Sequence, residues 1–175
     1  MATTRHQNTG PEEILGRSVR NAMRSIRALG PAMHAIKEPT SPQLARAVQA
    51  TENKWRAIDA EFELLTSRDV AAALGSRSSS PRGFTADQRK AGKLLAIRWG
   101  NQYRYPGFQI RDGHVLPVIQ QLISLADDSE WSPESLTMWL CTPTGWLSDK
   151  RPVDLLNGDP NAILDAARSE FTTEW

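Results

Sequence analysis

The sequence predicts a mainly α-helical protein in which one small β-hairpin separates two helical regions. Apolar residues recur at steps of four and three along two N-terminal stretches and again from Val115, which is the spacing of one helix face. Proline follows serine where helices should begin, as in Ser132-Pro133-Glu134. Two short β-type runs flank Gly100-Asn101, a pair of residues typical of a tight turn.

Composition limits the class of protein. With 175 residues, 39% hydrophobic and 23% charged, the chain has the composition of a folded globular protein rather than a disordered one. Its single cysteine, Cys141, excludes an internal disulfide framework and suits a reducing compartment. No apolar run approaches the roughly 18 residues of a membrane span, and residues 1–10 lack the apolar core of a signal peptide. We therefore expect a cytoplasmic protein.

Charge is distributed unevenly along the chain. The formal net charge is +1, but residues 1–114 contain 18 basic and 10 acidic residues, for a net charge of +8, and residues 115–175 contain 3 and 10, for −7. Within residues 64–111, nine basic residues stand against two acidic ones. This asymmetry indicates that one part of the chain binds a polyanion and another part binds something else.

The N-terminal region, residues 1–63, is predicted to contain two helices. The first covers residues 11–29 and ends at Gly30-Pro31. The second begins near Pro42 and has a long apolar seam, formed by Leu44, Val48, Thr51, Trp55, Ile58, Phe62 and Leu65. Two such seams can pack as a helical hairpin or pair with another copy. We favour a dimerisation unit, and hence a homodimer; the alternative is a core face covered by the rest of the chain.

Residues 64–111 have the element order of a DNA-binding module. Thr66 can cap a short helix that Gly75 ends, and Pro81 can start a second helix. A hairpin that turns at Gly100-Asn101 follows. A helix, a turn, a basic helix and a basic hairpin in this order predict a winged helix-turn-helix, whose second helix enters the major groove of DNA.

The side chains expected to bind operator DNA are basic, amide-bearing or hydroxyl-bearing. Arginine and glutamine can bind base edges with two hydrogen bonds. Serines near a helix N-terminus can contact phosphate, and basic hairpin residues attract any duplex. The predicted DNA-binding residues are Arg77, Ser79, Ser80, Arg82, Thr85, Gln88, Arg89, Lys93, Arg98, Gln102 and Arg104. The alternative interpretation of these charges is an ordinary solvated surface.

The last region, residues 112–175, is predicted to be helical around a loop. A broad apolar face begins at Val115, Ser132 can cap another helix, and short helices are expected at 152–156 and 160–167. The chain ends in Trp175, a bulky aromatic residue that is unusual in a solvated tail.

Two stretches of the sequence resemble known families. The run Gly92-Lys93-Leu94-Leu95-Ala96-Ile97-Arg98, followed by Tyr103-Arg104-Tyr105-Pro106, is similar to the winged helix-turn-helix of the excisionase and MerR type. The C-terminal third resembles the toxin-binding domain of the Xre/MbcA/ParS antitoxins, through Trp139, Thr142-Pro143, Leu147, Arg151-Pro152, Asp154-Leu155-Leu156, Gly158-Asp159, Ile163 and Ala166-Ala167. Residues 1–63 carry no such resemblance.

The second resemblance implies an antitoxin of a type II toxin–antitoxin system. Such a protein binds and blocks a cognate toxin, typically a RES-like protein that consumes NAD, and represses its own operon by binding DNA. The residues expected at the toxin interface are Trp139, Trp146, Arg151, Asp154, Phe171 and Trp175. Phe171 and Trp175 are expected to enter the partner's pocket, because aromatic side chains often dominate interface energies; Trp175 packing on its own domain is the alternative. A stand-alone transcription regulator with a C-terminal protein-interaction domain is the alternative function.

An enzyme is not expected. The histidines His6, His34 and His114 lack metal-ligand spacing. The sequence has no glycine-rich phosphate loop, no GxSxG elbow and no HExxH helix. Cys141 follows the apolar Trp139-Leu140 pair, which predicts an inert buried thiol. We therefore expect no catalytic residue, metal or cofactor.

Overall fold

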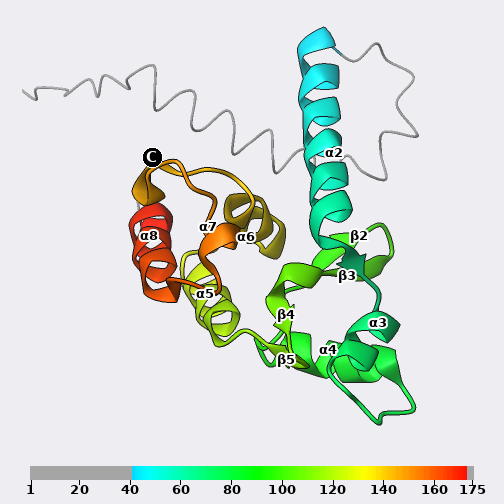
Figure 1. Ribbon diagram of the computed structural model, residues 1–175. Helices are drawn as coiled ribbons and strands as arrows, with labels where there is room; N and C mark the ends of the chain where they lie inside the picture. Colours follow the sequence, from blue (N-terminus) through cyan, green and yellow to red (C-terminus); the bar gives the residue numbers. More distant parts are fainter. Residues whose placement is uncertain (1–40, 173–175) are drawn as a thin grey trace, which may run out of the picture. The chain divides into compact units, whose positions relative to one another are not determined.

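The computed structural model describes residues 41–172 (Figure 1). These residues are mainly helical with a small antiparallel sheet, which confirms the predicted fold class at this level. Of the described residues, 51–172 belong to one compact unit. The helix predicted at 11–29 and the predicted contact of Trp175 lie outside the described residues. Within the described residues, no helix has the length and apolar character needed to cross a membrane.

The described residues form seven α-helices, five short strands and two 3-10 turns. The α-helices are α2 (Pro42–Phe62), α3 (Ser67–Ala73), α4 (Pro81–Lys90), α5 (Pro117–Asp128), α6 (Pro133–Leu140), α7 (Pro152–Leu155) and α8 (Pro160–Thr172). The strands are β1 (Leu64–Leu65), β2 (Ile97–Trp99), β3 (Gln102–Pro106), β4 (Ile110–Arg111) and β5 (His114–Val115), and the 3-10 turns are η1 (Gly107–Gln109) and η2 (Gly145–Leu147). Strand β3 is the central strand of an antiparallel sheet ordered β1-β3-β2, and β4 pairs with β5.

Local capping explains where three of the helices begin. The Thr66 hydroxyl accepts the backbone N–H of Asp69, and the Asp69 carboxylate accepts the N–H of Thr66, so both residues form a capping box at α3. The hydroxyls of Ser80 and Ser132 each accept an amide N–H three residues further on, and a proline follows each serine. The predicted starts of α3, α4 and α6 are confirmed.

Two features of the sheet structure differ from the prediction. Helix α2 ends at Phe62 rather than Leu65, because Glu63 adopts a left-handed φ of 58° and turns the chain into β1. The hairpin of β4 and β5 was not predicted; it turns at Asp112-Gly113, where φ is 50° and 79°, the left-handed pair that a two-residue hairpin needs. Strands of two residues are too short to show alternating polarity in the sequence.

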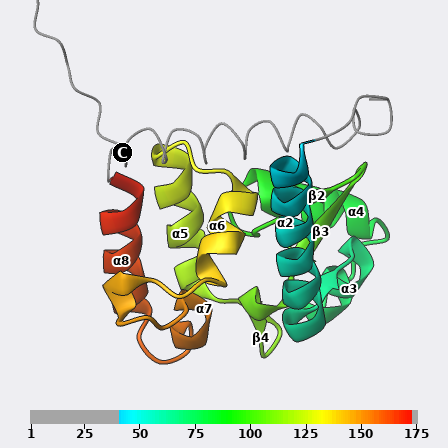
Figure 2. The same ribbon diagram turned by 90° about the horizontal axis from the view of Figure 1, so that it is seen from above.

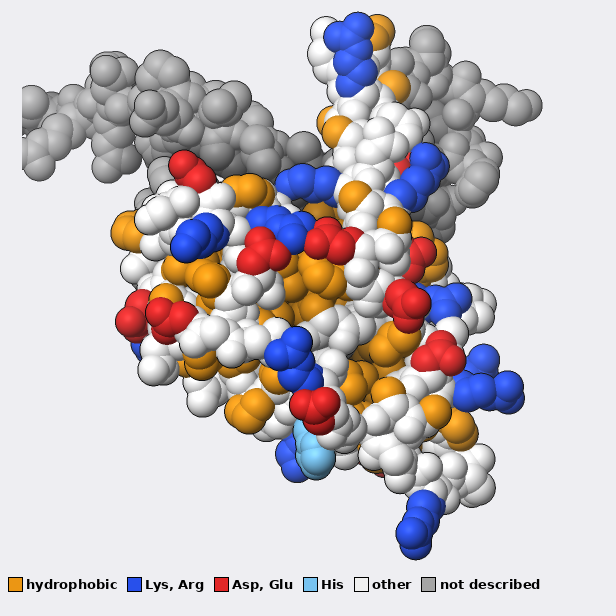
Figure 3. Space-filling model, viewed as in Figure 1, with side chains coloured by type: hydrophobic (Ala, Val, Ile, Leu, Met, Phe, Trp, Pro, Cys, Tyr) orange, Lys and Arg blue, Asp and Glu red, His pale blue; other side chains and the backbone are white. Residues whose placement is uncertain are grey.

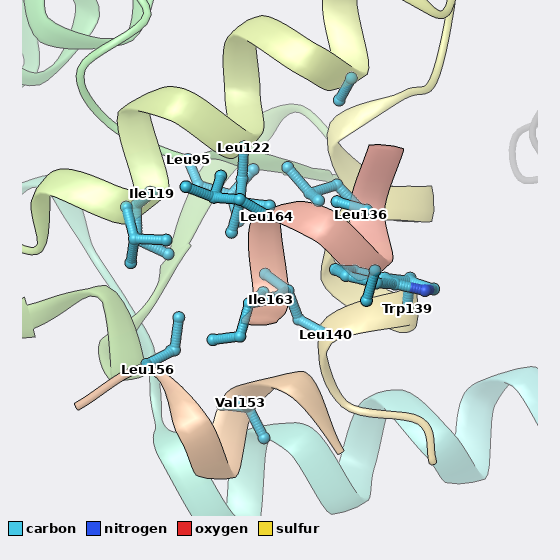
Figure 4. Close-up of a cluster of buried hydrophobic side chains, with 14 of the residues drawn as sticks. Leu95, Ile119, Leu122, Leu136, Trp139, Leu140, Val153, Leu156, Ile163 and Leu164 are labelled. Atoms are coloured by element: carbon cyan, nitrogen blue, oxygen red, sulfur yellow. The ribbon is translucent and has the colours of Figure 1, made fainter. Parts of the chain in front are cut away.

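The larger hydrophobic cluster lies among α5, α6, α7 and α8, and Figure 2 shows α5, α6 and α8 side by side. Its buried members include residues of all four helices, several of which are labelled in Figure 4: Ile119, Leu122, Leu136, Trp139, Leu140, Val153, Leu156, Ile163 and Leu164. Leu95, which precedes β2, belongs to the same cluster, and Phe62 and Phe108 pack against it. The C-terminal helices therefore share a core with the segment that leads into the hairpin.

A smaller cluster lies under α3 and is formed by Val70, Leu94, Ala96 and Tyr105. Leu94 and Ala96 face this cluster, whereas Leu95 faces the larger one, as the alternation of an extended segment requires. Gln109 is fully buried next to this extended segment. Its side-chain oxygen accepts the N–H of Leu95 at 2.8 Å, and its side-chain nitrogen donates to the C=O of Leu95 at 2.9 Å. These hydrogen bonds fix the extended segment between the two clusters.

Candidate nucleic-acid interface

Helices α3 and α4 pack against each other and are joined by a loop that starts at Gly75, where φ is 63°. Thr85 of α4 is fully buried, and its Oγ1 lies within hydrogen-bond distance, 3.0 Å, of both Ser67 Oγ and the Pro81 carbonyl oxygen. This burial contradicts the prediction that Thr85 contacts DNA. Its side chain instead fixes α4 on the N-terminal end of α3.

The other predicted DNA-binding residues of this segment reach the surface to different extents. Arg82 is exposed in the first turn of α4, next to the capping residue Ser80. Gln88 and Arg89, further along the helix, are half-buried. The remaining exposed candidates are Arg77, Ser79, Ser80 and Lys93. In Figure 3, basic side chains project along the right-hand edge, over the part that Figure 1 labels α3, α4 and the strands β2 and β3.

The hairpin of β2 and β3 presents its candidates on two different faces. Arg98 lies directly opposite Tyr103, so the two side chains share a face. Gln102 and Arg104 flank Tyr103 along β3 and therefore point to the opposite face. The structure does not bring Arg98, Gln102 and Arg104 together on one surface.

Each face of the hairpin contacts a different helix. On the face of Tyr103, the guanidinium carbon of Arg89 lies 4.1 Å from the centroid of the tyrosine ring, which places α4 against the hairpin. On the opposite face, Trp99 contacts Trp55 of α2 edge to face, with the ring centroids 6.1 Å apart. The hairpin is therefore held between α2 and α4.

The free edge of β2 is covered by a side chain of α6. Glu134 Oε1 accepts the backbone N–H of Arg98 at 2.9 Å. Sequence reasoning identified Glu134 only as an acidic residue in a first helical turn. It did not predict the contact of Trp55 with the hairpin or that of Arg89 with Tyr103. No local pattern pairs these residues, because each contact joins distant parts of the chain.

The predicted partner-binding residues Trp139 and Phe171 lie in the core. They are only 8% and 7% exposed, and their ring centroids are 5.3 Å apart. Trp131 packs on Phe171 at 4.2 Å between centroids. This burial contradicts the prediction that Phe171 enters a partner's pocket, and it places Trp139 in the core beneath the predicted interface rather than at its surface. Trp146 is 58% exposed and its indole N–H donates to Glu170 at 3.0 Å, so this side chain remains accessible to a partner.

Arg151 and Asp154, also predicted at the partner interface, bond each other, and Arg151 bonds Glu61 of α2 as well. Arg151 donates two hydrogen bonds of 2.8 Å to Glu61 and two, of 2.9 and 2.6 Å, to Asp154. Hydrogen bonding to the guanidinium holds the pKa of both carboxyls below the usual values, and these same bonds raise the pKa of Arg151. Glu61 was missed because 90 residues separate it from Arg151.

Cys141, the cysteine of this chain, is half-buried. Burial raises the pKa of the Cys141 thiol to about 12, so the thiol is protonated at neutral pH. Within residues 41–172, no group of three or more His, Cys, Asp or Glu residues could hold a metal ion.

Comparison with known proteins gives a fold relationship. No family model matches the sequence, and no curated protein matches it. Among solved structures, the NMR structure of Rv2175c is similar to this chain, with a TM-score of 0.55 and 23% sequence identity. The similarity covers 63% of this chain and 82% of the Rv2175c chain. At this identity, the similarity is one of fold alone.

Proposed function

We propose that the chain is a DNA-binding transcription regulator, in which α3, α4 and the β2–β3 hairpin act as a winged helix-turn-helix. The observation that carries this proposal is the placement of α4. Its inner side is fixed to α3 through Thr85, while its capped first turn exposes Arg82. Helices that read the major groove place their N-terminal residues against base edges in this way.

The charge of residues 64–111 also supports DNA as the partner. The net charge of residues 64–111 is +7, from nine basic and two acidic residues. One of the two acidic residues, Asp69, is engaged in the capping box, where hydrogen bonds from Thr66 hold its pKa below the usual value. Exposed Arg77, Lys93 and Arg98 add attraction for phosphate that does not depend on sequence.

The test is a selection of duplex sequences from a random pool by the full-length protein, followed by affinity measurements on the selected site and on each single-base variant. Arg82→Ala should relax the preference at about one base pair and cost about 1–3 kcal/mol. Arg168→Ala, which removes the same charge from α8, is the matched control and should preserve both affinity and preference. If no sequence is enriched and the wild-type protein binds every duplex equally, sequence-specific regulation is excluded.

A second function is proposed for the C-terminal helices: binding and neutralising a RES-type, NAD-consuming toxin, so that the protein is an antitoxin that represses its own operon. The exposed indole of Trp146 favours this function, because tryptophan is enriched among residues that dominate protein interfaces. The resemblance of the C-terminal third to the toxin-binding domain of the Xre/MbcA/ParS antitoxins motivates it as well. A regulator whose C-terminal region binds another protein, or only dimerises, is the competing proposal.

Co-expression with the product of the neighbouring reading frame separates these two proposals. An antitoxin should restore the growth of cells that express a toxic neighbour, and the two proteins should co-purify. A harmless neighbour that forms no complex would exclude neutralisation of that protein and favour the stand-alone regulator.

A further inference from the structure

We propose that Arg89 is a positioning residue that holds the β2–β3 hairpin against α4, and that it does not read a base. The proposal rests on the proposed DNA-binding function. It specifies how the two elements that would contact DNA, α4 and the β2–β3 hairpin, are held in a fixed position relative to each other. The sequence places Arg89 among the candidate base-reading residues of α4, whereas its geometry indicates a different role.

The guanidinium of Arg89 is engaged within the protein. Its carbon atom lies 4.1 Å from the Tyr103 ring centroid, well inside the roughly 6 Å range of a cation–π contact. Its Nε is buried and has no hydrogen-bond partner among residues 41–172. A guanidinium held over the ring in this way is turned towards the hairpin instead of extending from the helix towards a groove.

The position of Arg89 along α4 agrees with this role. Arg89 is the residue before Lys90, at the C-terminal end of the helix, and Arg82 is in the first turn. The two arginines are two helical turns apart, about 10 Å along the axis. Base contacts of a recognition helix come from its N-terminal residues, so Arg82 is placed to read DNA and Arg89 is placed to contact the hairpin.

The hairpin needs such a contact. Strand β1 pairs only with Tyr105 and Pro106 of β3, so the part of the hairpin nearer the turn has two strands. A two-stranded hairpin is only marginally stable by itself. Trp55 holds one of its faces, and Arg89 contacts Tyr103 on the other. Because Arg98 shares the face of Tyr103, the contact with Arg89 sets the distance between Arg98 and α4. Phosphate contacts by the hairpin therefore depend on the Arg89–Tyr103 contact.

The effect on DNA binding should be the same for every sequence. Loss of a partly exposed cation–π contact corresponds to about a two- to fivefold loss of affinity. Arg89→Ala and Tyr103→Ala should each produce this loss on the selected site and on its single-base variants. The order of preference among bases should not change. In the double variant the losses should not add, because either substitution alone removes the contact.

Conservative variants separate positioning from charge. Tyr103→Phe keeps the ring face and should retain wild-type affinity. Arg89→Lys keeps the positive charge but lacks the planar guanidinium that stacks on a ring, so it should restore only part of the lost affinity. Amide hydrogen exchange at Gly100 and Asn101, measured without DNA, should be faster in Arg89→Ala and unchanged in Tyr103→Phe. Thermal unfolding of each full-length variant controls for loss of the fold.

Three results would overturn the proposal. If Arg89→Ala alters the preference at one base pair and leaves the others unchanged, Arg89 reads a base. If the wild-type protein binds its selected site and Tyr103→Ala binds it equally well, the positioning role fails while the proposed DNA-binding function stands. If the wild-type protein binds no duplex, the proposed function fails, and the positioning role falls with it.

Discussion

The carboxylate of Glu134 accepts a hydrogen bond of 2.9 Å from the backbone N–H of Arg98, so the first turn of α6 covers the free edge of the hairpin. An uncovered edge strand would expose an unpaired donor. Leu95, just before the hairpin, is buried in the same cluster as Leu136 of α6. The C-terminal helices therefore support the hairpin directly, and they are part of the same packed unit as the proposed DNA-binding elements.

Removal of this carboxylate should loosen the hairpin. Glu134→Ala is expected to increase the exchange rate of the Arg98 amide by about tenfold, because a hydrogen bond to a charged acceptor contributes about 1.5–3 kcal/mol and partial exposure reduces that value. Affinity for all DNA sequences should fall together. Hydrogen exchange monitored by NMR measures the first effect, and duplex titration measures the second.

Glu134→Gln is the matched control, because its side-chain oxygen can still accept the Arg98 N–H. It should restore most of the protection. Equal protection of the Arg98 amide in the alanine variant and the wild type would show that Glu134 does not hold the edge of β2.

Local signals explain which parts of the fold could be predicted. The starts of α3, α4 and α6 follow from a capping residue and its neighbours within one helical turn. Contacts such as Glu134 with Arg98 or Glu61 with Arg151 join residues 36 and 90 positions apart and leave no local pattern. One sequence shows where a helix starts, but not which distant side chain it meets.

The candidate site was predicted less well than the fold, because the sequence of a short polar helix does not show which side of the helix is buried. Arg82, Thr85 and Arg89 follow the three-and-four spacing of one helical face, yet Arg82 is exposed and Thr85 is fully buried. The difference comes from α3, which covers the middle of that face and bonds the Thr85 hydroxyl.

Thr85→Val should therefore change stability rather than base preference. The valine fills the same volume but removes the hydroxyl that bonds Ser67, and the loss should cost about 1 kcal/mol of unfolding free energy. Chemical unfolding measures the cost, and binding to single-base variants of the selected site measures preference. Thr85→Ser, which keeps the hydroxyl, is the control for this bond. A change in preference at one base pair in Thr85→Val would contradict the structural role.

Gln109→Leu should destabilise the protein strongly. The Gln109 amide bonds the N–H and C=O of Leu95 and the C=O of Pro106, and all of these groups would lose a partner in a fully buried position. We expect a loss of about 3 kcal/mol or more in the free energy of unfolding, measured with urea. The exposed Gln121→Leu is the matched control and should change stability by no more than about 0.5 kcal/mol. Equal effects of both substitutions would exclude this role for Gln109.

The Arg151 ion pairs should contribute to stability only above acidic pH. Because folding lowers the pKa of Glu61 and Asp154 from ordinary values of 4.5 and 3.8, the stabilisation is complete above those values and is lost as pH falls through the lower folded values. Arg151→Gln should cost about 0.5–1 kcal/mol at pH 7, since both carboxylates are partly exposed.

The difference in unfolding free energy between Arg151→Gln and the wild type should shrink as the pH is lowered below about 4. Urea unfolding at a series of pH values measures it. Arg168→Gln, which breaks an exposed pair within α8, serves as the control. A difference that stays constant from pH 7 to pH 3 would show that the ion pairs do not stabilise the fold.

Alanine substitutions at Trp146 and Phe171 should have different effects, the first on partner binding and the second on folding. Trp146 is 58% exposed, so Trp146→Ala should change the unfolding free energy by no more than about 0.5 kcal/mol and preserve DNA binding, yet abolish co-purification with a toxin. Phe171 packs between Trp131 and Trp139, so Phe171→Ala should cost about 3–5 kcal/mol and impair every activity through loss of the core. Growth rescue and urea unfolding of both variants provide the comparison. Full neutralisation by Trp146→Ala would place the toxin interface elsewhere on the C-terminal helices.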